Sequence, residues 1–323
     1  MMTLNQADSE IPFAQLVQAA APGSKLLRAW PLTGGISAQM TALELEHPNG
    51  RIIRWVVRQP GEDTLRLHPH AAEVEYQLLQ LLHARGLAVP APIYLDPAGA
   101  IFSSPVLVLE YIEGRPEFAP ADAPDFARQM ASRLVHIHRA AGPGADLSFL
   151  PPPQAGFREN FGDSHAGAGL LDKEDHLRAV LRAAWPIPPR NPPALLHGDY
   201  WPGNVLWRGG RLAAVIDWED AVLSDPLMDF AITRLDLFWI FNPEIEGAFS
   251  RGYLALNPLD DSSLPYWDLS AVLRLARLIG TDPAGWAAFF HPFGRTDISP
   301  SSIRTSLNAF AARALDLLHT IHS

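Results

Sequence analysis

Short apolar runs separated by turn residues characterise the first third of the chain. Glycine, proline and asparagine punctuate these runs, as at residues 48–50, which is typical of strands joined by tight turns. At residues 71–86 the apolar side chains instead recur every three or four positions, which predicts a helix that ends at Gly86. We therefore expect an antiparallel sheet with one helix packed on it, and a loop at Pro90 and Pro92. The predicted strands are 26–32, 40–46, 52–58 and 106–112, and a further short helix is expected at 13–20.

From about residue 125 onward the pattern is mainly helical, although two short strands are expected around Asn204 and Asp217. The change in pattern near Glu113 predicts two domains, a β-rich lobe over residues 1–112 and a helical lobe over residues 113–323. The expected fold class is α+β. The predicted helices of the second lobe are 126–139, 175–184, 227–241, 244–256, 267–279 and 301–322.

The amino-acid composition limits the kinds of partner and of chemistry that we expect for this chain. The 323 residues carry a net charge of −10, which argues against binding nucleic acid through its phosphates. The chain has no cysteine, so disulfides, thiolate metal sites and cysteine nucleophiles are excluded. Residues 1–12 do not resemble a signal peptide, and no run reaches the ~18 apolar residues of a membrane span. We expect a cytoplasmic protein that does not bind membranes, and the oligomeric state is not predicted.

Three polar residues in the middle of the chain carry the clearest chemistry. Asn204 follows Asp199 by five residues, and Asp217 ends a short apolar run. Phosphoryl transfer to a hydroxyl needs a carboxylate that orients the hydroxyl and accepts its proton, and oxygen ligands that hold magnesium. Taken alone, each residue has an ordinary structural explanation, namely a turn or cap for Asp199 and Asn204, and a buried aspartate satisfied by backbone amides for Asp217. Their joint spacing predicts a catalytic base at Asp199 and magnesium ligands at Asn204 and Asp217.

These residues belong to two short motifs, His197-Gly198-Asp199 and Ile216-Asp217-Trp218. With Asn204 between them, they resemble the motifs of the aminoglycoside phosphotransferase and choline kinase family, small-molecule kinases related in fold to protein kinases. The resemblance implies a two-lobed kinase-like fold, with a small antiparallel sheet in the first lobe and a larger helical second lobe. It also implies that His197 and Asp229 support the catalytic loop structurally.

The resemblance extends upstream to a nucleotide site. Gly34, Gly35 and Ser37 lie between two predicted strands and resemble the loop that covers the nucleotide phosphates, although two adjacent glycines are equally typical of a hairpin turn. Glu110 and Ile112 lie in a segment that resembles the hinge, where an adenine would bond to backbone groups. ATP is the expected nucleotide, and GTP stays an alternative.

A lysine that is usual in the third strand of protein kinases is replaced here by Arg58. Arginine is always charged and can bind phosphate with two donors, so we expect Arg58 to hold the nucleotide phosphates. An exposed surface arginine is the alternative interpretation. Its expected carboxylate partner is Glu75 on the following helix, with Glu73 as the rival.

The acceptor site is the least defined part of the prediction. Carboxylates and tryptophan faces can hold an amine, but the same residues are also common in helical cores and on surfaces. The sequence does not distinguish among an antibiotic, choline, an amino acid, a sugar or another metabolite as acceptor. The candidate acceptor residues are Trp201, Glu219, Asp220, Asp236 and Trp239.

The predicted function is magnesium-dependent transfer of the γ-phosphate of ATP or GTP to a hydroxyl of a small molecule. A catalytically impaired nucleotide-binding or protein-interaction module of the same fold is the alternative, since the usual lysine is missing. A protein substrate is disfavoured because Asp217 is followed by Trp218-Glu219 rather than Phe-Gly, and no activation segment ending in Ala-Pro-Glu is found.

Overall fold

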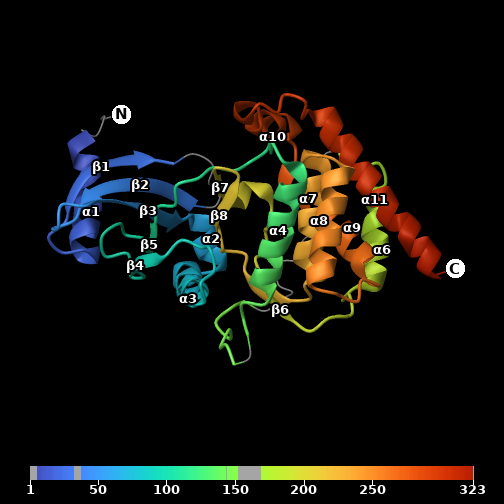
Figure 1. The fold of residues 1–323 in the computed structure, drawn as a ribbon, viewed down its shortest axis with the longest axis horizontal. Helices are drawn as coiled ribbons and strands as arrows, with labels where there is room; N and C mark the ends of the chain where they lie inside the picture. Colours follow the sequence, from blue (N-terminus) through green and yellow to red (C-terminus); the bar gives the residue numbers. More distant parts are fainter. Residues whose placement is uncertain (1–5, 33–37, 143, 152–168, 323) are drawn as a thin grey trace. The chain divides into compact units, whose positions relative to one another are not determined.

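A computed structural model describes residues 6–32, 38–142, 144–151 and 169–322 (Figure 1). The chain divides into two compact units. The first comprises Met1–Glu113 together with Ala214–Glu219, and the second comprises Gly114–Ala213 and Asp220–Ser323. The short segment Ala214–Glu219, which carries Asp217, is therefore packed in the first unit although it lies far along the chain.

The first unit is built on one five-stranded antiparallel sheet. Strands β2 and β3 pair continuously from Ala38 opposite Pro60 to Glu46 opposite Ile52, which places Arg58 opposite Met40. The loop predicted at Pro90 and Pro92 is wrong in part, because Pro92 begins an edge strand, a position where proline is tolerated. In sheet order the strands are β1 (Lys25–Pro31), β2 (Ala38–Glu46), β3 (Ile52–Pro60), β5 (Val106–Glu110) and β4 (Pro92–Asp96).

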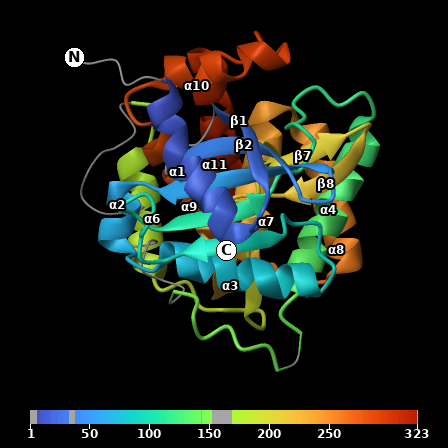
Figure 2. The same cartoon turned by 90° about the vertical axis from the view of Figure 1, so that its left-hand side faces the viewer.

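The described part of the first unit contains three helices. Two were expected, one packed on the sheet and a short one at 13–20. Helix α1 (Gln6–Ala20) crosses one face of the sheet (Figure 2), where Leu16 and Val17 are fully buried against strand residues such as Leu43 and Trp55. Helix α3 (Ala71–Ala84) packs on β3, β4 and β5. Helix α2 (Glu62–Leu67) buries no residue, so it leaves no apolar periodicity for a sequence to show.

The second unit is mainly helical. Helix α7 is its core, since every one of its residues except Phe238 is buried, and it packs on α8 and α9. Helix α4 lies along α8, and α9 also contacts α6 and α11 (Figure 1). None of the described helices is both long and apolar enough to cross a membrane. The helices are α4 (Ala123–His138), α6 (Glu174–Ala184), α7 (Leu227–Ile240), α8 (Pro243–Leu256), α9 (Leu264–Ile279), α10 (Pro283–Phe289) and α11 (Pro300–His322).

Two short strand pairs frame the segments that carry the candidate chemistry. Strand β6 (Ala194–Leu196) pairs antiparallel with β9 (Val222–Ser224), and His197 follows β6 directly. Strand β7 (Val205–Arg208) pairs with β8 (Arg211–Val215). Gly209 and Gly210 between them both have positive φ, which suits the two-residue turn of a tight hairpin. Asn204 thus lies just before β7, and Asp217 lies two residues after β8.

Candidate active site

A buried aspartate holds the loop that carries Asp199. The Asp229 carboxylate on α7 accepts the backbone N–H of His197 at 2.7 Å and that of Gly198 at 2.9 Å, and His138 Nε2 lies 3.4 Å from it. Burial by itself would raise the pKa of Asp229, but the hydrogen bond and charge of His138, together with His197, hold that pKa below its ordinary value. The ionised Asp229 therefore fixes the backbone immediately before Asp199.

Glycine is required at position 198 of this loop. Gly198 has a φ of 83°, and a Cβ atom there would overlap the backbone carbonyl of Asp220. Only a residue without a side chain fits both conditions, which gives the His-Gly-Asp order a physical reason. One turn further, the Thr233 hydroxyl on α7 donates to the carbonyl of Tyr200 at 2.7 Å, so the loop is tied to α7 on both sides of Asp199.

The Asp199 carboxylate is oriented by two donors. Its Oδ2 accepts the Asn204 side-chain N–H at 2.9 Å, and its Oδ1 accepts an N–H of Arg274 at 2.8 Å. Because an ionised carboxylate only accepts hydrogen bonds, the amide nitrogen of Asn204 must face Asp199. The Asn204 Oδ1 atom therefore does not face Asp199, and the role of Asn204 as a magnesium ligand stays a prediction.

The first unit contains a cluster of three carboxyl groups around Arg58, called here the Arg58 cluster. Arg58 is 5% exposed. Its Nε lies 2.9 Å from Glu75, its Nη1 lies 2.9 Å from Asp217, and its Nη2 lies 2.6 Å from Glu219. The predicted contact with Glu75 is present, whereas the rival Glu73 lies beside His70 instead. Arg58 is thus a buried ion-pair residue and not an exposed strand residue.

Burial and charge act in opposite directions inside the Arg58 cluster. Burial alone would lower the pKa of Arg58, but Glu75, Asp217 and Glu219 together hold it above its ordinary value. Burial raises the pKa of Glu75 to about 7, against the opposing effect of Arg58. Three carboxylates around one guanidinium carry an excess of negative charge, which a divalent cation would offset.

Asp217 occupies an unusual backbone conformation. Its φ is 66°, in the left-handed region that aspartate and asparagine tolerate better than most residues. The Trp218 indole N–H donates to the carbonyl of Val215 at 3.0 Å, and this buried ring anchors the turn. Asp217 keeps 33% of its side chain exposed. Its carboxylate and the Asn204 amide are each oxygen donors of the kind magnesium prefers, and no group of three or more acidic, histidine or cysteine side chains in the described part of the chain is placed to hold a metal.

The residues predicted for the acceptor separate into buried and accessible ones. Asp236 and Trp239 form a buried pair, in which the indole N–H donates to the carboxylate at 2.8 Å, and burial raises the pKa of Asp236 to about 7. Glu219 belongs to the Arg58 cluster. Asp220 keeps 58% of its side chain exposed and lies 3.7 Å from Arg274. A role in acceptor binding stays a prediction for all of them.

Trp201, the remaining acceptor candidate, lies in the catalytic loop itself. Its ring is half-buried, covers Gly203 and packs against Phe118 and Phe289, with ring centroids 6.0 and 6.2 Å away. The contact with Gly203 leaves no room for a side chain at that position. The ring thus helps to shape the loop between Asp199 and Asn204.

Part of the predicted nucleotide site is not described. Gly34, Gly35 and Ser37 lie outside the described residues. In the hinge segment, the Glu110 backbone N–H donates to the carbonyl of Ala91 at 2.8 Å, and its carboxylate accepts the Ala91 N–H at 3.2 Å. Ile112 lies two residues after Glu110, beyond the end of β5. Adenine binding at Glu110 and Ile112 stays a prediction.

Sequence reasoning missed Arg274, which contacts Asp199, and two residues that help to hold the loop around it, His138 and Thr233. Arg274, His138 and Thr233 sit on helices whose apolar spacing made them look like ordinary helix residues. Nothing in the local sequence of α9 marks Arg274, because its partner lies 75 residues earlier in the chain. The missed residues are all connected to Asp199 by tertiary packing and not by a local motif.

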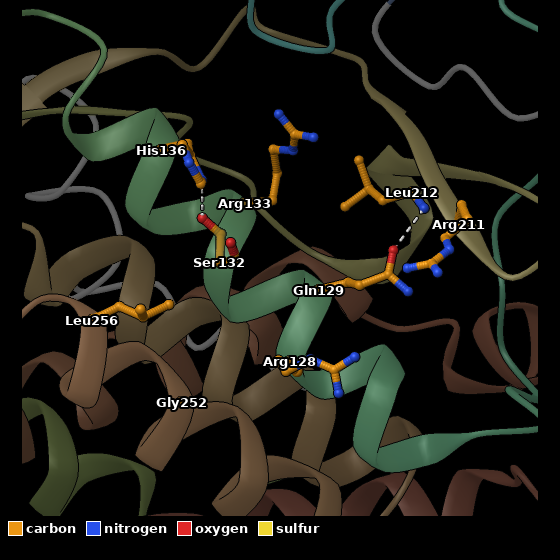
Figure 3. A pocket seen from close by; sticks show the side chains of 9 residues that line it. All are labelled: Arg128, Gln129, Ser132, Arg133, His136, Arg211, Leu212, Gly252 and Leu256. Carbon is orange, nitrogen blue, oxygen red and sulfur yellow. Dashed lines mark hydrogen bonds between the residues drawn. The ribbon is translucent and has the colours of Figure 1, made fainter.

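A separate cavity of about 550 Å³ opens beside α4 in the second unit (Figure 3). Gln129 lies at its wall and accepts the backbone N–H of Leu212 at 3.0 Å. None of the residues predicted for catalysis lines this cavity. Its lining residues are Arg128, Gln129, Ser132, Arg133, His136, Arg211, Leu212, Gly252 and Leu256.

Known proteins resemble this chain in sequence and in fold. The model of the phosphotransferase enzyme family matches residues 29–266. A homoserine kinase of Rhizobium johnstonii is 30% identical over 239 residues, which cover 64% of this chain and 70% of that protein. Among solved structures, macrolide 2′-phosphotransferase type I superposes with a TM-score of 0.60 at 20% identity, covering 97% of this chain and 99% of its own. The ternary complex of APH(2″)-IIa with streptomycin and ATP gives 0.56 at 17% identity, covering 94% and 99%.

The chain therefore belongs to the phosphotransferase enzyme family. It is a small-molecule kinase whose acceptor is a hydroxyl group. The predicted α+β class with a kinase-like fold is confirmed by the sheet of the first unit, the helices of the second and the superposed structures.

Proposed function

We propose that this protein transfers the γ-phosphoryl group of ATP, in the presence of magnesium, to the hydroxyl of an amino-acid-sized acceptor. The observation that carries the proposal is the Asp199 carboxylate, which is held by Asn204 and Arg274 on a loop fixed by Asp229. A carboxylate oriented in this way can accept a hydrogen bond from the acceptor hydroxyl and take its proton as the new O–P bond forms.

The residues that would hold the nucleotide and the metal follow from the same geometry. Arg58 is fixed by Glu75 and presents its guanidinium to Asp217, so it would bind nucleotide phosphates when the cluster opens toward a ligand. Asn204 and Asp217 would each give one oxygen to magnesium. The bound metal would neutralise the charge that develops on the phosphoryl group.

Homoserine is the first acceptor to test. The relatives matched by sequence include homoserine kinases at 30% identity, whereas the superposed antibiotic kinases share 20% or less with this chain. Sequence similarity at that level supports a related acceptor better than a shared fold does, since one fold serves many substrates.

The test measures nucleotide consumption with homoserine, antibiotics and other hydroxylated metabolites, using ATP and GTP separately. Replacing Asp199 by Asn keeps the shape of the side chain but removes the base, so kcat should fall by about 10²- to 10⁴-fold. Asp316→Asn, an exposed change on α11, serves as the control and should retain wild-type activity. If no acceptor is phosphorylated while ATP still binds, the proposal is wrong and the alternative of an impaired binding module stands.

A further inference from the structure

Arg274 contacts the proposed catalytic base, and no sequence motif identifies it. It lies on α9, keeps 17% of its side chain exposed, and approaches Asp199 with a single nitrogen, Nη2, at 2.8 Å. The same nitrogen lies 3.7 Å from Asp220. Burial by itself would lower the pKa of Arg274, but the neighbouring carboxylates, Asp199 first among them, hold it above its ordinary value. A permanent cation therefore stands beside the proposed catalytic base.

Most of the hydrogen-bonding capacity of Arg274 is unused. A guanidinium carries five N–H donors in a planar fork, and it can bind two anions on different edges. In the described part of the chain, the Nε and Nη1 atoms of Arg274 have no hydrogen-bond partner, and neither is a fully buried atom. An arginine that only positioned Asp199 would not need a second edge with unused donors.

Asp220 provides the opposite charge at the same place. Its carboxylate is 58% exposed, and its backbone carbonyl touches Gly198 in the catalytic loop. The Nη2 atom of Arg274 thus lies near both the proposed base, Asp199, and an accessible anion, Asp220. These charges are complementary to a small zwitterion that carries its hydroxyl a few bonds from a carboxylate and an ammonium group.

Resting on the proposed kinase function, we propose that Arg274 binds a carboxylate of the acceptor, that Asp220 binds its ammonium group, and that the acceptor is therefore a small hydroxy amino acid. Arg274 would keep Nη2 on Asp199 and use its free edge for the acceptor carboxylate, so one side chain both orients the base and selects the substrate. A polycationic acceptor is disfavoured because its amines would meet the guanidinium of Arg274 close to the base.

Three related acceptors separate the two contacts. Homoserine carries both groups, 4-hydroxybutanoate lacks the ammonium group, and 3-aminopropan-1-ol lacks the carboxylate. In Arg274→Met, kcat should fall for all three because Asp199 loses a donor. The carboxylate of 4-hydroxybutanoate also loses its partner, whereas 3-aminopropan-1-ol has no carboxylate to lose one. The ratio of kcat/KM for 4-hydroxybutanoate to kcat/KM for 3-aminopropan-1-ol should therefore fall by about 10- to 100-fold, which corresponds to the free energy of one charge-assisted hydrogen bond. Asp220→Asn should shift the same ratio in the opposite direction.

Two further variants control for folding and for charge. Arg277→Met changes the same residue type one turn along α9 and should leave the acceptor ratio unchanged, with thermal unfolding reporting on the stability of each variant. Arg274→Lys keeps a positive charge but loses the fork, so it should restore only part of the ratio.

The outcomes distinguish the two proposals. Phosphorylation of cationic acceptors alone by the wild-type protein would overturn the role of Arg274 and leave the kinase function standing. An equal loss for all three acceptors in Arg274→Met would show that Arg274 only positions Asp199, and would also overturn it. If the wild-type protein phosphorylates no acceptor of any kind, both proposals are wrong.

Discussion

Arg58 and Arg234 are both buried arginines paired with several carboxylates, yet their surroundings differ. Arg234 on α7 binds both oxygens of Asp268 at 2.8 Å and Glu246 at 2.8 Å, and Arg313 adds a second cation at 3.1 Å from Glu246. Arg234, Glu246 and Asp268 are at most 10% exposed. Two cations face two anions here, and the partly exposed member is a cation, Arg313, with 36% of its side chain exposed.

In the Arg58 cluster the charges are not balanced, and the partly exposed members are carboxylates. One guanidinium faces three carboxylates, and two of them, Asp217 and Glu219, keep 33% and 22% of their side chains exposed. A buried ion pair alone is weak evidence for function, since many serve only packing and orientation. What separates the two arginines is the unneutralised charge and the access of solvent to it. Those two properties are what a site for metal and phosphate requires.

Removing each arginine should give the largest contrast. Arg234→Met leaves Glu246 and Asp268 buried without their main partner, so we expect a loss of about 3–5 kcal/mol in the free energy of unfolding, measured with urea. Arg58→Met should cost less stability, because Glu75 can take up a proton and the other two carboxylates are partly in water. Its main effect should be on kinase activity, with a loss of at least about 10²-fold.

Arg251→Met, at an exposed position on α8, controls for the loss of one positive charge and should change stability by no more than about 0.5 kcal/mol. Equal losses of stability in the Arg58 and Arg234 variants would show that both clusters are structural. The functional distinction between the Arg58 cluster and the Arg234 cluster would then be wrong.

The sequence predicted these regions unequally, and the reasons are physical. Long periodic segments such as 71–86 and 267–279 correspond to helices α3 and α9, because an amphipathic face repeats over several turns. Strands β6 and β9 have three residues each, which is too short to show an alternation of apolar and polar residues. Helix α2 buries no side chain, so it shows no apolar periodicity. Their existence depends on neighbours that are distant in sequence.

The same distinction applies to the site. Asp199 and Asn204 sit on one short loop, so their spacing along the chain already fixes their contact. The ion pair of Arg58 with Glu75 could also be predicted, because β3 and α3, which carry the two residues, are separated along the chain only by the short helix α2. The contact of Arg274 with Asp199 could not be predicted, because only the packing of α9 brings the two residues together. The balance of charge around Arg234 likewise becomes visible only when four helices, α7, α8, α9 and α11, are assembled.

The next largest effect should be a difference between the two clusters in how they change the stabilisation by ATP and magnesium. With ATP present at about 100 times its dissociation constant, binding should stabilise the wild-type protein by about 2.7 kcal/mol, and we expect this gain to depend on magnesium. Asp217→Asn should lose the magnesium-dependent part, because an amide attracts the cation less than a carboxylate does. Asparagine also tolerates the left-handed backbone at this position, so the turn should persist.

Asp268→Asn makes the same chemical change in the Arg234 cluster and should keep the magnesium-dependent shift in unfolding temperature, whatever its own stability. The measurement is thermal unfolding with ATP, with and without magnesium. An undiminished magnesium response in Asp217→Asn would remove the metal assignment of that residue.

The smallest expected effect is a difference in pH dependence between the clusters. Burial raises the pKa of Glu75 from 4.5 to about 7 and that of Asp268 from 3.8 to about 6. A carboxyl group whose pKa is higher in the folded state favours folding when protonated. Its contribution is fully present below the unfolded pKa and is lost as pH rises through the folded pKa.

Each group should therefore lower the free energy of unfolding as pH rises within its own window, by at most about 1.4 kcal/mol per pH unit. Glu75→Gln mimics the protonated group and should remove the decline between pH 4.5 and about 7, while Asp268→Asn should remove the decline between pH 3.8 and about 6. Urea unfolding at a series of pH values measures both. Unchanged slopes in both variants would mean that the paired arginines keep these carboxylates ionised across the whole range, and burial would then not be what sets their charge.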